Sequence, residues 1–125
     1  MHVAIEPQRK CWGEVRHCFA SPAAAVSYLE VVEGAWCSRH WHADRVNMFV
    51  VLTGKIIVEE WEEGGAVGTH CLGPGDAFTV PANVIHRFSV LESGQVIEIY
   101  YPSRSGATVR ADDIFRIDEG GRRGD

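Results

Sequence analysis

The sequence lacks any hydrophobic run long enough to cross a bilayer, which excludes a membrane-spanning helix. It also lacks an excess of positive charge, because 17 Asp and Glu residues outnumber 12 Lys and Arg residues and the net charge is -5. Nucleic acid and anionic membrane are therefore not expected as main partners. The remaining composition, 46% hydrophobic and 23% charged, is ordinary for a globular protein, and 125 residues suffice for one domain.

A secretory signal and a paired cysteine motif are also absent. Residues 1–7 contain no basic region followed by a long apolar stretch. The four cysteines form no Cys-x-x-Cys pair, so we expect reduced thiols rather than a disulfide framework or a thiolate metal site. Together these absences predict a cytoplasmic protein.

What the sequence does contain is a series of short β-forming segments separated by turn residues. The segments cover residues 12–19, 25–33, 48–52, 56–61, 67–72, 77–80, 84–91 and 95–101. Residues 62–65 predict a hairpin turn and residues 73–76 a tight turn. Because almost no room remains for a crossover helix, the pattern predicts an all-β, antiparallel sandwich or barrel.

Two histidines with one residue between them mark the first candidate site. In an extended chain His40 and His42 point the same way, so their imidazoles would project side by side. His86 follows a second strand-and-turn segment and supplies a third imidazole. Singly, each could be an ordinary structural histidine; jointly, three neutral imidazoles on strands predict a site for a divalent transition metal.

The segments around these histidines resemble the paired motifs of the cupin superfamily. The first motif has glycine, His-x-His, glutamate and glycine at the places of Gly34, His40, His42, Asn47 and Gly54, so an asparagine replaces the usual glutamate. The second has its glycine, proline and histidine at Gly75, Pro81 and His86, while Asn83 and Val90 replace a glycine and an asparagine. The resemblance implies an antiparallel double-stranded β-helix, the cupin jelly-roll barrel, over residues 12–117. Residues 1–11 would form an N-terminal arm and residues 118–125 a flexible C-terminal tail.

Within the superfamily, the sequence resembles the cupin domain of bifunctional mannose-6-phosphate isomerases and small sugar-isomerase-like cupins. The similarity is carried by residues 12–13, 40–54, 80–88 and 111–118. It implies a divalent metal that polarises a sugar carbonyl and hydroxyl while a base moves a proton between adjacent carbons. No basic pocket for a phosphate is evident, since Arg39, Arg45 and Arg87 are scattered.

Two further candidates have roles that stay open at this point. Asn47 either binds the metal through its amide oxygen or hydrogen-bonds a metal-bound water; in both cases the protein leaves the charge of the ion uncompensated, which favours an anionic substrate or bound hydroxide. Glu98 lies in an apolar segment with Tyr100. It is either a general base on the inner face of the barrel, beside Tyr100, or an outward, solvated glutamate.

Three functions are consistent with these residues. The first is a metal-dependent cupin that isomerises or epimerises a small polar, sugar-derived substrate, with Glu98 and Tyr100 as catalytic residues. The second is a three-histidine non-haem iron dioxygenase, and the third is a non-catalytic cupin that binds a sugar or another small ligand. Imidazole ligands accept zinc, iron, manganese or nickel, so the metal is not specified. We expect a homodimer, because an open β-sandwich needs its edges covered.

Overall fold

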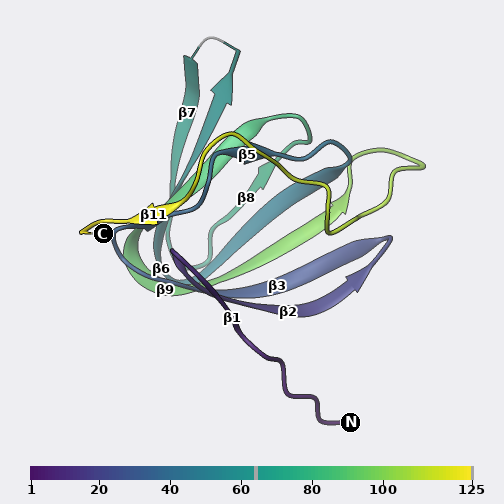
Figure 1. The fold of residues 1–125 in the computed structure, drawn as a ribbon, viewed down its shortest axis with the longest axis horizontal. Helices are drawn as coiled ribbons and strands as arrows, with labels where there is room; N and C mark the ends of the chain where they lie inside the picture. Colours follow the sequence, from purple (N-terminus) through teal and green to yellow (C-terminus); the bar gives the residue numbers. More distant parts are fainter. Residues whose placement is uncertain (64, 125) are drawn as a thin grey trace.

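The computed structural model describes residues 1–63 and 65–124, which form one curled antiparallel sheet (Figure 1). No helix occurs in these residues, and hence none that could cross a membrane. The all-β, antiparallel fold class is therefore confirmed. The strands are β1 (Gln8–Lys10), β2 (Gly13–Ser21), β3 (Ala24–Val31), β4 (Ala35–Trp36), β5 (His40–Trp41), β6 (Arg45–Glu62), β7 (Gly65–Leu72), β8 (Ala77–Val80), β9 (Ile85–Pro102), β10 (Phe115–Arg116) and β11 (Gly121–Arg122).

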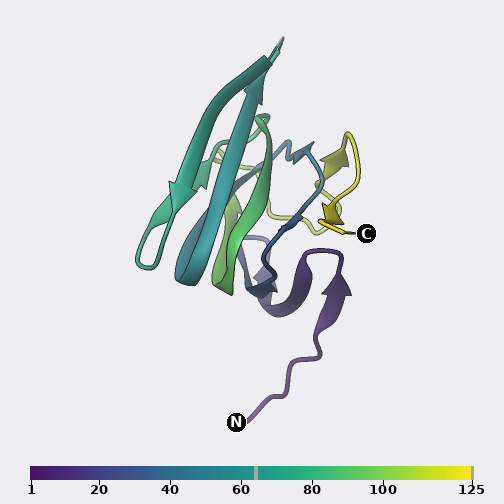
Figure 2. The ribbon, with the colours of Figure 1, turned by 90° about the vertical axis from the view of Figure 1, so that its left-hand side faces the viewer.

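The two longest strands, β6 and β9, organise the sheet. They pair with each other along almost their whole length, from Arg45 opposite Pro102 to Trp61 opposite Ile85. β6 also pairs with β7 and β8, while β9 also pairs with β3, β4 and β5. As Figures 1 and 2 show, the sheet curls around an interior, and the segments after β3 and after β9 run along its open side.

The prediction of separate strands on either side of residues 53–54 and 92–94 is wrong. β6 runs through the first turn signal and β9 through the second, and their mutual register shifts between Val51 and Ile56. Gly54 adopts a φ of 81°, and a Cβ there would lie 2.7 Å from the carbonyl oxygens of Glu92 and Ser93. Glycine therefore lets the two strands bend together at a corner of the barrel without ending.

The interior is filled by alternate residues of the strands. Asn47, Phe49 and Val51 are 0%, 1% and 0% exposed, as expected for residues that share the inner face of β6. The buried apolar cluster continues this face across the other strands. It comprises Val15, Leu29, Val31, Cys37, Phe49, Val51, Ile56, Val58, Leu72, Val80, Phe88, Val90 and Val96.

The two ends of the chain differ in how they contact the body. Residues 1–10 are exposed and project from it (Figures 1 and 2), although β1 pairs with β2. At the other end, β10 pairs with β5 and β11 pairs with β4. Two residues of the segment predicted as a flexible tail are thus strand-paired. Gly64 of the predicted hairpin turn and Asp125 of the predicted tail lie outside the described residues.

Candidate metal centre

Three histidines from distant parts of the chain meet inside the barrel. His40 belongs to β5 and lies opposite His86 of β9, and His42 follows directly after β5. Their side chains are 7%, 0% and 1% exposed, in that order. One nitrogen from each ring can be chosen such that all three lie within 4.8 Å of one another. The extended His-x-His segment and the β5–β9 register together produce this convergence.

Hydrogen bonds to the backbone fix the tautomer of each ring. The Nδ1 atoms of His40, His42 and His86 lie 2.8, 2.7 and 2.9 Å from carbonyl oxygens of Ser38, Asp113 and Val84, respectively. A carbonyl oxygen only accepts, so the proton is on Nδ1 and the lone pair of each ring is on Nε2. For His42, the 2.7 Å bond to Asp113 outweighs a longer contact of 3.3 Å between Nδ1 and Nε of Arg45. His42 Nε2 is buried and has no hydrogen-bond partner among the described residues. A cation at the centre of the cluster would satisfy this atom, so the residues fit a metal.

Burial keeps all three rings uncharged at neutral pH. Desolvation, together with the neighbouring His42, lowers the pKa of His40 to about 4. Desolvation, together with Arg45 and His86, lowers the pKa of His42 to about 4 against the opposing bond to Asp113. Desolvation and His40 lower the pKa of His86 to about 3. Neutral imidazole is the form that binds a metal, so the cluster needs no deprotonation at pH 7.

Asn47 lies between the histidines and the candidate base. Its Oδ1 atom is 3.1 Å from Nε2 of His86, and its Nδ2 atom donates to Oε2 of Glu98 at 3.2 Å. Because the His86 proton is on Nδ1, Oδ1 and Nε2 face each other as two acceptors. Two acceptors at this distance are arranged as two ligands of one cation would be.

Glu98 and Tyr100 both face the cavity, so the outward interpretation of Glu98 is wrong. They lie opposite Phe49 and Asn47 in the β6–β9 register, and both line the cavity that His40 lines. The Glu98 residue is half-buried. Burial raises the pKa of Glu98 against hydrogen bonds from Asn47 and Tyr100. Burial and the neighbouring Glu98 raise the pKa of Tyr100 well above 10.0, so its phenol stays protonated.

Asp113 is a site residue for which sequence reasoning assigned no role. It is 0% exposed, and besides accepting from His42 through its carbonyl it accepts from the backbone N–H groups of Ala43 and Asp44 at 2.8 and 2.9 Å. It therefore holds the loop that follows the His-x-His segment. The only signal in the sequence was the ordered appearance of residues 111–117, because no local pattern links Asp113 to a loop seventy residues away.

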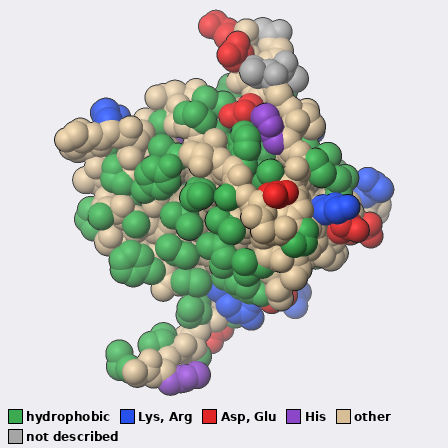
Figure 3. Space-filling view, turned by 180° about the vertical axis from the view of Figure 1, so that it is seen from behind, with side chains coloured by type: hydrophobic (Ala, Val, Ile, Leu, Met, Phe, Trp, Pro, Cys, Tyr) green, Lys and Arg blue, Asp and Glu red, His purple; other side chains and the backbone are tan. Residues whose placement is uncertain are grey.

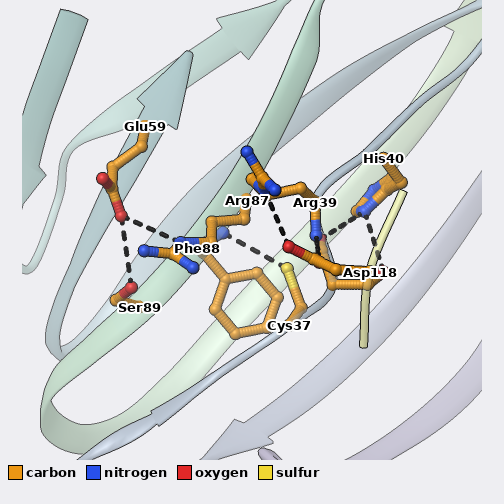
Figure 4. A network of polar contacts seen from close by, with 9 residues as sticks. Cys37, Arg39, His40, Glu59, Arg87, Phe88, Ser89 and Asp118 are labelled. Carbon is orange, nitrogen blue, oxygen red and sulfur yellow. Dashed lines mark hydrogen bonds and ion pairs between the residues drawn. The ribbon is translucent and has the colours of Figure 1, made fainter. Parts of the chain in front are cut away.

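A second aspartate, Asp118, fixes the other side of the His-x-His segment. Its carboxylate accepts from the backbone N–H and from Nε of Arg39, both at 2.7 Å, beside His40 (Figure 4). Burial raises the pKa of Asp118, but these bonds outweigh that effect and the net pKa is lowered. Arg87 is likewise paired, with Glu59 at 3.1 Å. Of the three scattered arginines only Arg45 lines the cavity.

The cavity beside the histidines has a volume of about 580 Å³. It is lined by polar residues, including His40, Arg45, Glu98 and Tyr100, and by apolar side chains such as Leu29 and Phe88. Cys37 also lines it, but burial raises the pKa of its thiol to about 12, and its Sγ accepts from the backbone N–H of Phe88 at 3.2 Å. The thiol is therefore protonated, and the metal-binding chemistry here rests on imidazole.

Comparisons with known proteins agree with the fold. A family model described as "Cupin domain" matches residues 27–100. Oxalate decarboxylase from Bacillus subtilis is similar with a TM-score of 0.75 and 18% identity over 90% of this chain, which spans only 30% of that one. KdgF from Halomonas sp. is 26% identical with a TM-score of 0.67, over 79% of this chain and 89% of that one. Comparison with curated proteins gives no match.

Proposed function

The chain belongs to the cupin family, and from that premise we propose that it isomerises or epimerises a small polar, sugar-derived molecule. It is a metal cupin whose cofactor is a divalent transition metal. In this proposal Nε2 of His40, His42 and His86 and Oδ1 of Asn47 hold the ion. The likeness to KdgF from Halomonas sp., which covers most of both chains, supports the assignment of these residues to one cupin domain.

The observation that carries the proposal is a carboxylate one side chain away from the histidine cluster. Glu98 is joined to Asn47 at 3.2 Å, and Asn47 is 3.1 Å from His86. The same cavity is lined by Glu98, Tyr100 and His40. Proton transfer between adjacent carbons needs a base within hydrogen-bond reach of a substrate that the metal also binds. Glu98 is the carboxylate at that place.

Each residue then has a defined task. A divalent cation, when bound, supplies Lewis-acid polarisation of a substrate carbonyl or hydroxyl oxygen. Glu98 takes a proton from the carbon beside the carbonyl and, in an isomerisation, returns it to the former carbonyl carbon. The hydroxyl proton passes from one substrate oxygen to the other, so that the atoms balance. Tyr100, protonated because its pKa is raised, donates a hydrogen bond to Glu98 and orients the carboxylate. Leu29 and Phe88 keep the walls of the cavity apolar and limit the access of water.

Proton exchange with solvent tests this proposal. Protein loaded with Zn(II) is incubated in D₂O with a panel of aldoses, ketoses and their phosphates, and NMR follows deuterium incorporation and conversion. We expect at least one substrate to turn over, and Glu98→Gln to lower the rate by roughly 10²-fold or more. Glu92→Gln, an exposed change on the same strand, is the control and should leave the rate unchanged.

Two results would contradict the proposal. Unchanged turnover in Glu98→Gln would show that Glu98 is not the base. Oxygen uptake that requires Fe(II) and is absent with Zn(II), with no proton exchange on any sugar, would favour the three-histidine dioxygenase instead.

We further propose that the chain forms a homodimer through its N-terminal arm. Residues 1–10 are exposed, with Val3 and Ile5 66% and 37% exposed, and hydrophobic side chains gather on the face shown in Figure 3. Light scattering on the full chain should give the mass of two chains, and the double change Val3→Asp and Ile5→Asp should give one. A full chain that is monomeric at micromolar concentration would contradict this assembly.

A further inference from the structure

Arg45 is a buried cation that lines the cavity. It is 6% exposed at the start of β6, and its guanidinium carbon lies 3.8 Å from the centroid of the Tyr100 ring. Its Nη1 atom donates to the carbonyl oxygen of Arg110 at 2.6 Å, and its Nε atom lies 3.3 Å from Nδ1 of His42. These contacts hold the guanidinium in one orientation beside Glu98 and the histidines. None of them supplies a negative charge.

No carboxylate forms an ion pair with Arg45 within residues 1–63 and 65–124, although other arginines of this region have such partners. Arg39 pairs with Asp118 and Arg87 with Glu59, both at the border of the site. Asp44, the neighbour of Arg45 in sequence, pairs with Arg104 and Arg110 instead. The charge of Arg45 lowers the pKa of Asp113 and opposes the raised pKa of Glu98, but neither carboxylate lies within ion-pair distance of it. A buried guanidinium without a directly paired carboxylate is unfavourable, unless a ligand supplies one.

The interior of the cavity is short of negative charge as a whole. The three imidazoles are neutral and Asn47 is an amide, so the proposed ligands leave the charge of the cation uncompensated. Three carboxylates line the cavity in the described part of the chain: Asp118 is paired with Arg39, Glu119 is exposed, and Glu98 accepts from Asn47. Even with Glu98 counted as an anion, the cation and Arg45 leave the interior positive. An anionic ligand would reduce this excess.

We propose that Arg45 recognises a carboxylate group on the substrate, so that the substrate is a small organic acid, such as a sugar acid, and not a neutral sugar. This inference rests on the proposed function, because the substrate is placed at the same metal centre. The planar fork of a guanidinium matches the two oxygens of a carboxylate. One buried arginine matches a single negative charge. The other cations that line the cavity, Lys10 and Arg116, are exposed, so a phosphate dianion would lack a second buried cation.

Calorimetric titration of Zn(II)-loaded protein tests the inference with paired probes. The carboxylates are glycolate and D-glucuronate, their neutral counterparts are ethylene glycol and D-glucose, and D-glucose 6-phosphate represents the phosphates. We expect at least one carboxylate to bind at least tenfold more tightly than its neutral counterpart and than the phosphate. Arg45→Met should lose this preference at least tenfold, whereas Arg16→Met, which removes a cation outside the cavity, should keep it.

If Arg45→Met does not fold, Arg45→Lys is measured in its place. Lysine keeps the charge but offers no fork, so affinity for the carboxylate should fall at least threefold while affinity for the neutral probe stays constant. The inference is overturned if neither carboxylate binds, if the phosphate binds more tightly, or if both Arg45 variants keep the preference. Metal content is measured in every sample. Wild-type protein that takes up no zinc overturns the proposed function as well, whereas loaded protein without the preference overturns this inference alone.

Discussion

The histidine rings are oriented by the backbone and not by the cation. Each Nδ1–H donates to a carbonyl oxygen within 2.7 to 2.9 Å, and in two of the three cases the acceptor is two residues away in sequence. The Nε2 lone pairs are therefore directed before a metal binds, which reduces the reorganisation that binding requires. Asn47 differs from the rings because its amide oxygen is directed by a bond from Nδ2 to Glu98.

The role of Asn47 leads to a prediction at the residue scale. Asn47→Asp places a carboxylate where we propose a neutral amide ligand, so affinity for Zn(II) should rise about tenfold or more, at the expense of the bond to Glu98. Competition with a chelating dye measures the change. An affinity equal to that of the wild type would show that the side chain of Asn47 does not contact the ion.

At the scale of elements, the C-terminal segment completes a site whose histidines all lie before residue 87. The pairing of β10 with β5 brings this segment along the His-x-His strand, and Trp41 stacks on Phe115 with ring centroids 4.2 Å apart. Asp113 and Asp118 then bind the backbone on the two sides of that strand. The segment acts as a strap that keeps two of the three histidines in place.

Asp113→Asn tests this strap. The amide keeps one oxygen acceptor but turns a donor toward the second backbone N–H, so stability should fall by about 1–3 kcal/mol and metal affinity by roughly tenfold. Asp112→Asn is the matched control, because the side chain of Asp112 is 87% exposed. Urea unfolding of both variants measures the difference. Equal stabilities would contradict the strap.

The same carboxylate predicts a pH dependence. Burial raises the pKa of Asp113, but the bonds from Ala43 and Asp44 and the charge of Arg45 outweigh it, and the net pKa lies below the ordinary 3.8. Because the folded state holds the pKa down, the stabilisation is complete above pH 3.8 and is lost as pH falls through the lowered value. The stability gap between wild type and Asp113→Asn should therefore narrow below that pH. A stability difference that stays constant with pH would contradict the lowered pKa of Asp113.

The bend of β6 gives a prediction for a second element. A Cβ at Gly54 would lie 2.7 Å from two carbonyl oxygens of β9, whereas at Gly106, with a similar φ of 85°, it would meet nothing within 4 Å. Gly54→Ala should therefore destabilise the protein by about 2 kcal/mol or more beyond Gly106→Ala, which carries the backbone strain alone. Chemical unfolding compares the two, and equal losses would mean that the corner tolerates a side chain.

At the scale of the whole molecule, the parts that follow local rules were predictable. Alternation along an extended chain placed His40 and His42 together and Asn47 with Phe49, and the two histidine motifs indicated the barrel. The continuity of β6 and β9 was not predictable, because a glycine in the sequence can mark either a bend within a strand or the end of a strand. The inward placement of Glu98 depended on a register across β6 and β9, and the role of Asp113 on a contact between distant segments. Neither is a local property.

The metal content of purified protein tests the central claim most directly. After loading with Zn(II) and removal of excess ion, elemental analysis should give one equivalent per chain for the wild type and for His70→Ala, since His70 lies outside the cluster and bonds Glu60. His42→Ala and His86→Ala should each hold less than about a tenth of an equivalent, because two imidazoles and an amide do not complete a tetrahedral site. Wild-type protein without bound metal, or histidine variants that load as fully as the wild type, would contradict the account.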